Sequence, residues 1–167
     1  MIALMALAAG LALPSPQLDI ATRVAGPGKP DCVSQAADGA TGPCLPVFRV
    51  TPGGQINAWT SGTRIAFSRA AAVRLTRDEF ALLAGHEIAH YYLGRRASGH
   101  ADELEADRLG AQLACAAGFD VAAGASVFRF LQADADHPPP AVRRAAVLAA
   151  GCRPSPSARA APPDTPP

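Results

Sequence analysis

The chain carries few charged residues and almost no excess of either sign. Only 17% of its 167 residues are charged, and the formal net charge is +1. Nucleic-acid-binding domains usually carry a basic patch or stripe, and neither a basic patch nor a stripe interleaved with aromatic residues is present here. The composition therefore argues against a nucleic-acid-binding function.

Long apolar runs are missing from most of the chain. A membrane-spanning helix needs about 20 apolar residues, and no segment after residue 13 reaches that length. Residues 1–13 form an uncharged apolar run that ends at Pro14. We interpret this run as the core of a signal peptide, with a cleavage site near Gly10 to Ala12; a buried N-terminal helix is the alternative. The basic region that normally precedes such a core is missing, so we expect the natural start to lie upstream. The sequence thus predicts an exported bacterial protein, periplasmic or secreted.

The four cysteines lack the C-x-x-C spacing that is typical of zinc sites. An even number of cysteines in an exported chain indicates disulfide bonds instead. Three pairings are possible, and we favour Cys32–Cys44 and Cys115–Cys152. The first would close residues 14–45, a segment rich in Pro, Gly, Ser and Asp that we expect to be irregular. The second would tie the last helix to an earlier one.

The main functional motif is H-E-x-x-H, formed by His86, Glu87 and His90. Residues four apart lie on one face of a helix, so the two histidines can bind one metal ion while Glu87 serves as general base. Thr76 and Glu79 form a capping box that begins the helix, and Gly94 ends it. The alternatives are two histidines without a metal and a closed structural zinc site, which has no use for Glu87.

A second helix, predicted at residues 101–117, carries candidates for the remaining site positions. A catalytic zinc ion usually has three protein ligands and one open position. Glu103 and Asp107 lie four apart and share a helix face. We predict Glu103 as the third ligand and Asp107 as a hydrogen-bond acceptor for one histidine. Gly94, Ser98 and Gly99 supply turn residues between the two helices.

These elements resemble the M48 family of zinc metallopeptidases, which pairs H-E-x-x-H with a later E-x-x-A-D helix. Two further segments are similar to the family: Asn57-Ala58-Trp59 with the hairpin that follows, and His137-Pro138-Pro139-Pro140 with Arg143. The resemblance covers roughly residues 46–150. It implies that the strand around Asn57 and Ala58 binds an extended substrate, and that His137 is an active-site loop residue. It also implies a compact, soluble zincin-like member with one Zn2+ ion. Arg143 is expected to hold the His137 loop onto a carboxylate.

The predicted fold class is α+β, with a small antiparallel sheet packed on a helical core. Strands are predicted at residues 47–50, 55–59 and 63–67, separated by turns with glycine. Further helices are predicted at residues 121–133 and 141–150. We expect residues 46–152 to form the metallopeptidase domain and residues 153–167 to be a disordered Pro-rich tail.

The sequence leaves three functions open. The leading hypothesis is a zinc-dependent endopeptidase that acts on exported or unfolded polypeptides. The second is a latent or non-catalytic quality-control module for envelope proteins, gated by the His137 loop. The third is hydrolysis of a non-peptide amide, such as a cell-wall bond.

Overall fold

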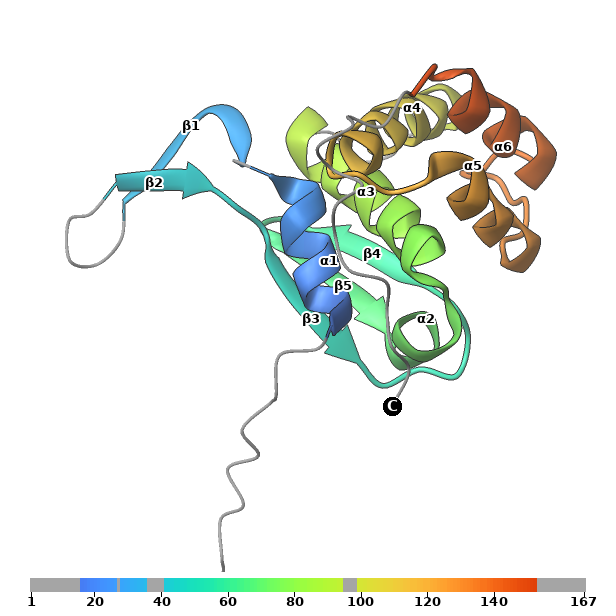
Figure 1. The fold of residues 1–167 in the computed structure, drawn as a ribbon, viewed down its shortest axis with the longest axis horizontal. Coiled ribbons are helices and arrows are strands. Elements are labelled where there is room, and N and C mark those ends of the chain that lie inside the picture. Colours follow the sequence, from blue (N-terminus) through green and yellow to red (C-terminus); the bar gives the residue numbers. More distant parts are fainter. Residues whose placement is uncertain (1–15, 27, 36–40, 95–98, 153–167) are drawn as a thin grey trace, which may run out of the picture.

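The computed structural model describes residues 16–26, 28–35, 41–94 and 99–152, without the side chains of residues 29–35 and 41–43. The predicted signal peptide, Ser98 and the predicted tail lie outside the described residues. The fold is α+β (Figure 1). Its helices are α1 (Pro16–Ala25), α2 (Arg69–Arg74), α3 (Arg77–Leu93), α4 (His100–Ala116), α5 (Val121–Gly124), the 3-10 helix η1 (Ala125–Phe130) and α6 (Pro140–Ala149). Its strands are β1 (Lys29–Gln35), β2 (Thr41–Cys44), β3 (Val47–Thr51), β4 (Ala58–Ser61) and β5 (Arg64–Ser68).

The main sheet is mixed, so the prediction of an antiparallel sheet was wrong. Its strand order is β3-β5-β4, with β3 parallel to β5 and β4 antiparallel to β5. The last four residues of β5 are buried, which accounts for its central position. Residues 52–57 carry the chain across the sheet instead of forming a hairpin. The second predicted strand begins at Ala58 instead of residue 55, and at this point the Asn57 side-chain oxygen accepts a hydrogen bond from the Ala58 N–H.

The segment predicted to be irregular contains regular structure. Helix α1 buries Ile20, Ala21 and Val24 in the core, and β1 and β2 form an antiparallel pair. In Figure 1 this pair extends away from the rest of the fold. The Pro and Gly content of residues 14–45 concealed an apolar spacing of helical period in residues 20–24. The Cys32 side chain lies outside the described part, so its pairing with Cys44 stays a prediction.

Helix α3 is the centre of the fold. It packs against α1, β4, α4, α5 and η1, and every residue from position 79 to position 89 is buried. The predicted capping box is confirmed: the Glu79 N–H donates to the Thr76 hydroxyl at 3.3 Å, and the Thr76 N–H donates to Glu79 Oε2 at 2.9 Å. The predicted end at Gly94 is also confirmed, in a left-handed conformation. A helix buried on all sides holds its side chains in fixed positions.

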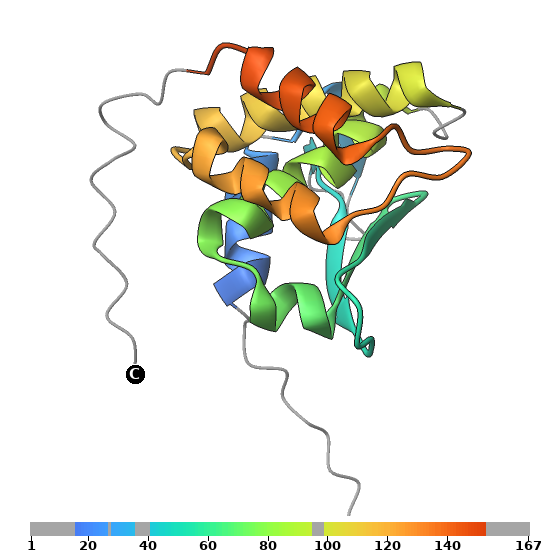
Figure 2. The ribbon, with the colours of Figure 1, turned by 90° about the vertical axis from the view of Figure 1, so that its right-hand side faces the viewer.

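Helices α4, α5 and α6 pack against one another, and α4 and α5 also pack against α3. Figure 2 shows α6 running beside α4 and above the α5–η1 segment. The predicted helix at residues 121–133 is shorter, because α5 continues as a 3-10 helix that ends at Phe130, and Leu131 is extended. The predicted disulfide Cys115–Cys152 is present, with the two Cα atoms 5.9 Å apart. It ties the residues after α6 to α4.

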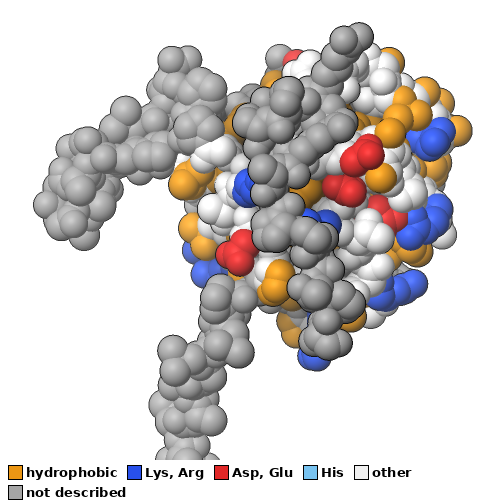
Figure 3. Space-filling view, in the orientation of Figure 1, with side chains coloured by type: hydrophobic (Ala, Val, Ile, Leu, Met, Phe, Trp, Pro, Cys, Tyr) orange, Lys and Arg blue, Asp and Glu red, His pale blue; other side chains and the backbone are white. Residues whose placement is uncertain are grey.

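The surface mixes charges of both signs. On the face drawn in Figure 3, acidic and basic side chains are interspersed with apolar ones wherever side chains are described. This distribution agrees with the net charge of +1. Within the described ranges, no helix is both long and apolar enough to cross a membrane.

Candidate metal centre

Helix α3 presents His86 and His90 on one face, one turn apart. Their Nε2 atoms lie 3.0 Å from each other, and the two rings are nearly perpendicular. Both side chains are about nine-tenths buried. Two ring nitrogens that face each other this closely converge on one point, as the i, i+4 spacing predicts.

Glu103 on α4 completes a group of three. Its Oε1 lies 3.2 Å from His90 Nε2, and its Oε2 lies 3.4 Å from His86 Nε2. Bonds of about 2.0–2.1 Å that meet at tetrahedral angles place their ligand atoms about 3.4 Å apart. The observed separations of 3.0 to 3.4 Å fit that geometry. The group His86, His90 and Glu103 can therefore hold a metal ion.

The Glu103 carboxylate also has an unsatisfied atom that a cation would engage. Within the described part of the chain, Oε2 is the one fully buried side-chain oxygen or nitrogen without a hydrogen-bond partner. Burial favours the neutral acid, but the nearby rings of His86 and His90 outweigh it, and the pKa of Glu103 lies well below its ordinary value. Glu103 is thus an anion, the form in which a carboxylate binds a metal.

Asp107 and Arg143 both contact the His86 ring. Asp107 Oδ1 lies 2.9 Å from His86 Nδ1. Arg143 on α6 donates to both Asp107 oxygens, from Nε at 2.9 Å and from Nη2 at 2.8 Å. Arg143 Nη2 also lies 3.1 Å from His86 Nδ1, but a guanidinium accepts no hydrogen bond, so a proton on Nδ1 is donated to Asp107. That tautomer leaves Nε2 free to bind a metal.

The surroundings of His86 favour positive charge. Burial alone would lower its pKa, but hydrogen bonds with Asp107 and Glu103 raise the pKa of His86 to about 9 in the metal-free chain. Two carboxylates face one guanidinium here, that of Arg143. The two carboxylates thus favour a cation at this position, either a proton on His86 or a metal ion.

Glu87 is held by a residue that the sequence analysis missed. The Thr60 hydroxyl on β4 lies 2.7 Å from Glu87 Oε2 and 2.9 Å from the Glu87 carbonyl oxygen. Glu87 is buried, and Thr60 is half-buried. Thr60 directly follows the strand predicted at residues 55–59, and this position next to Asn57-Ala58-Trp59 is the one signal that could have indicated it.

His137 lies over the metal-binding group, held by another missed residue. Its Nε2 is 3.8 Å from Glu103 Oε2. Its Nδ1 and its backbone N–H both lie 2.8 Å from Asp134 Oδ1. Asp134 thus orients the ring so that Nε2 faces the site. The D-x-x-H spacing was the available signal, because a short acidic side chain often bonds to the backbone of its own turn.

Two cavities meet at the metal-binding group. They have volumes of about 550 Å³ and about 850 Å³. Both are bounded by five shared residues: Asn57, Ala58, His86, Glu87 and His137. The smaller extends toward Ile56, Leu83, Phe130 and Leu131, and the larger toward Trp59, His90 and Tyr91. Together they follow β4, an edge strand, past the group of ligands.

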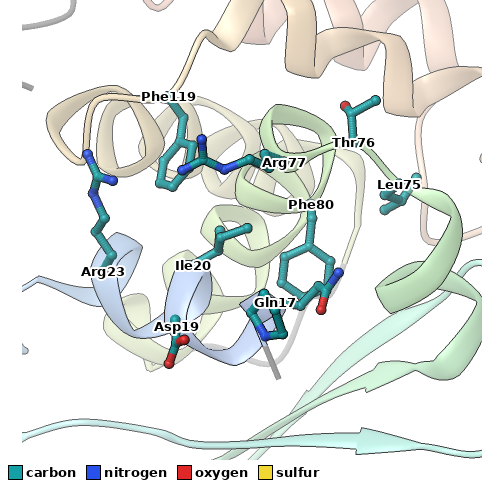
Figure 4. Close-up of a pocket in the computed structure, with 10 residues that line it drawn as sticks. Gln17, Asp19, Ile20, Arg23, Leu75, Thr76, Arg77, Phe80 and Phe119 are labelled. Atoms are coloured by element: carbon teal, nitrogen blue, oxygen red, sulfur yellow. The ribbon is translucent and has the colours of Figure 1, made fainter. Parts of the chain in front are cut away.

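A third cavity of about 360 Å³ lies elsewhere, between α1 and the start of α3 (Figure 4). Arg23 and Arg77 both lie over the ring of Phe119 there, at 5.0 and 5.8 Å from its centroid. Its described lining contains no histidine or cysteine. It is not part of the metal-binding group.

Comparisons with protein-family models, with curated proteins and with solved structures find no match to this chain. The resemblance to M48 peptidases therefore rests on the sequence elements described above.

Proposed function

We propose that the protein is a zinc-dependent endopeptidase of the M48 type, with a zincin-like active site. One observation carries the proposal: three ligand atoms at tetrahedral separations lie beside Glu87, in a cleft that follows an edge strand. A closed structural site would need a fourth protein ligand. Among the described residues, the group of mutually close ligand atoms contains three members.

His86, His90 and Glu103 would hold the ion, with Asp107 fixing the His86 ring. Two histidines and one carboxylate form a common ligand set of catalytic zinc. When bound, zinc polarises the scissile carbonyl and makes a water molecule more acidic. Glu87 takes the proton of the attacking water as the new C–O bond forms. It then donates this proton to the amine nitrogen as the C–N bond breaks.

His137 is suited to stabilise the developing negative charge on the carbonyl oxygen. Its Nε2 faces the ligands, and its Nδ1 lies 2.8 Å from the Asp134 carboxylate. A hydrogen-bond donor held in place before the reaction stabilises such charge efficiently.

The proposed substrate is an extended segment of an exported or unfolded polypeptide. The outer edge of β4 carries no paired strand among the described residues. An extended peptide can hydrogen-bond to such an edge, and cavities on both sides of the site leave room for its side chains. This binding mode favours peptides over other amides.

The proposal can be tested with unfolded casein. Wild-type protein loaded with zinc should cut casein at internal bonds, which mass spectrometry of the fragments identifies. A chelator should abolish cleavage, and added zinc should restore it. Cleavage that persists without metal would contradict the proposal.

The position of His137 also supports a second candidate, a latent module whose metal is capped. Its Nε2 lies 3.8 Å from Glu103 Oε2, close enough for a small loop shift to bring it to the ion. The two candidates predict opposite effects of His137→Ala. Cleavage falls if His137 stabilises the reaction and rises if His137 blocks the metal.

A further inference from the structure

We propose that Thr60 is a positioning residue, which fixes the proposed general base Glu87 relative to the substrate-binding edge. This inference rests on the proposed peptidase function. It concerns a hydrogen bond between a strand and a helix that are far apart in the sequence. Thr60 Oγ1 lies 2.7 Å from Glu87 Oε2 across 27 residues of chain.

The orientation of Thr60 follows from the strand. Side chains alternate between the two faces of a strand, and along β4 Ala58 and Thr60 are half-buried while Trp59 and Ser61 are exposed. Thr60 therefore faces α3. Its β-branched side chain has few rotamers, so the hydroxyl keeps its position at little entropic cost.

The hydroxyl has one hydrogen and two acceptors within reach. The Glu87 carbonyl oxygen lies at 2.9 Å and the carboxylate oxygen Oε2 at 2.7 Å. The carboxylate is the stronger acceptor, because hydrogen bonds to charged groups are shorter and stronger. Oε1 receives no hydrogen bond from the described residues, and its carboxylate lines both cavities of the cleft. Thr60 thus holds one oxygen and leaves the other for the proton transfer.

The hydrogen bond between Thr60 and Glu87 connects the proposed substrate-binding strand to the proposed general base. The backbone of β4 sets where an extended peptide lies, and the side chain of the same strand sets where the base lies. A general base must be within hydrogen-bond reach of the proton that it takes. Loss of the contact should therefore reduce turnover more than it reduces substrate binding.

The test compares Thr60→Val, which keeps the shape, with Thr60→Ser, which keeps the hydroxyl. In zinc-loaded protein, Thr60→Val should lower kcat for a casein-derived peptide about 10- to 100-fold, since hydrogen bonds to charged groups have that strength. KM should change by less than about twofold, and Thr60→Ser should retain most of kcat. Thr51→Val is a matched control, because Thr51 lies on the opposite edge strand β3 and its hydroxyl donates to a backbone carbonyl oxygen, that of Phe67.

A second readout needs no activity. In metal-free protein, Thr60→Val should lower the urea midpoint when Glu87 is present and have a smaller effect in a Glu87→Ala background. Equal effects in both backgrounds would overturn the inference. If the wild type is active and the kcat of Thr60→Val lies within twofold of the wild-type value, the inference is also overturned. The peptidase proposal would then remain intact. Absence of cleavage by the wild type would contradict the proposed function, and the catalytic part of this inference with it.

Discussion

The backbones of Gly85 and Gly110 are in direct contact where α3 crosses α4. A Cβ atom placed on Gly85 would lie 2.4 Å from the Gly110 carbonyl oxygen, and one on Gly110 would lie 2.6 Å from the backbone nitrogen of His86. Only residues without a side chain permit this approach. The crossing brings His86 on one helix to Glu103 and Asp107 on the other.

Substitution of Gly110 should therefore damage both the fold and the metal site. In Gly110→Ala the added Cβ atom would overlap the backbone of Gly85 and His86, so the helices must separate. We expect a loss of about 1–3 kcal/mol in the free energy of unfolding and reduced zinc occupancy. Urea unfolding and metal analysis measure the two effects. Gly54→Ala is the control, because a Cβ there meets nothing within 4 Å. Equal stability of the two variants would show that the close crossing is not needed.

Asp107→Asn should weaken metal binding without unfolding the protein. The carboxylate accepts from His86 and from Arg143, so its loss leaves the His86 ring less firmly oriented. Removal of such a partner typically lowers metal affinity about 10- to 100-fold. Competition with a chromophoric chelator measures this affinity. Asp19→Asn, on the exposed face of α1, should leave it unchanged. Wild-type affinity in Asp107→Asn would refute the orienting role.

Glu79 should make the protein sensitive to acid. Burial favours its neutral form, but hydrogen bonds from Arg129, Ser126 and Thr76 lower its pKa from 4.5 to about 2. Between these values the unfolded chain binds more protons, so the free energy of unfolding falls as the pH is lowered from about 5 to about 2. We expect a contribution of about 1–3 kcal/mol, reduced by the exposure of Arg129. Urea unfolding of wild type and Glu79→Gln from pH 6 to pH 3 isolates it. If the free energy of unfolding changed with pH equally in both proteins, Glu79 would not be the source of the acid sensitivity.

The Cys115–Cys152 disulfide should stabilise the protein and hold α6 in place. It closes a loop across 37 residues, for which a stabilisation of about 2–4 kcal/mol is typical. Replacement of both cysteines by alanine should lower the melting temperature. Zinc affinity should fall less than in Asp107→Asn, because the Arg143–Asp107 contact can persist without the bond. An unchanged melting temperature would show that the packing of α4 and α6 suffices.

The motif-bearing helices could be predicted from the sequence because their signals are local. Thr76 with Glu79 marks the start of α3 and Gly94 its end, and the four-residue spacing of His86 and His90 directs both to one point. Glu103 could be assigned by spacing on its own helix. The disulfide Cys115–Cys152 belonged to the favoured one of three possible pairings, and it is present in the structure.

Features that depend on tertiary contacts could not be predicted in this way. The parallel pairing of β3 with β5 depends on which strand is most buried, and strand composition does not reveal this. Helix α1 was hidden by the Pro and Gly residues around it. The sequence signals for Thr60 and Asp134 were weak, and their roles became clear only from the side chains that face them in the structure.

The most direct test of the central claim measures zinc content and casein cleavage side by side, in wild type and in Glu87→Gln. Glu87 is not one of the three ligands, so the substitution should leave metal binding intact. We predict one equivalent of zinc in both proteins and cleavage by the wild type alone. Absence of zinc from both proteins, or cleavage by Glu87→Gln at the wild-type rate, would contradict the proposed metallopeptidase.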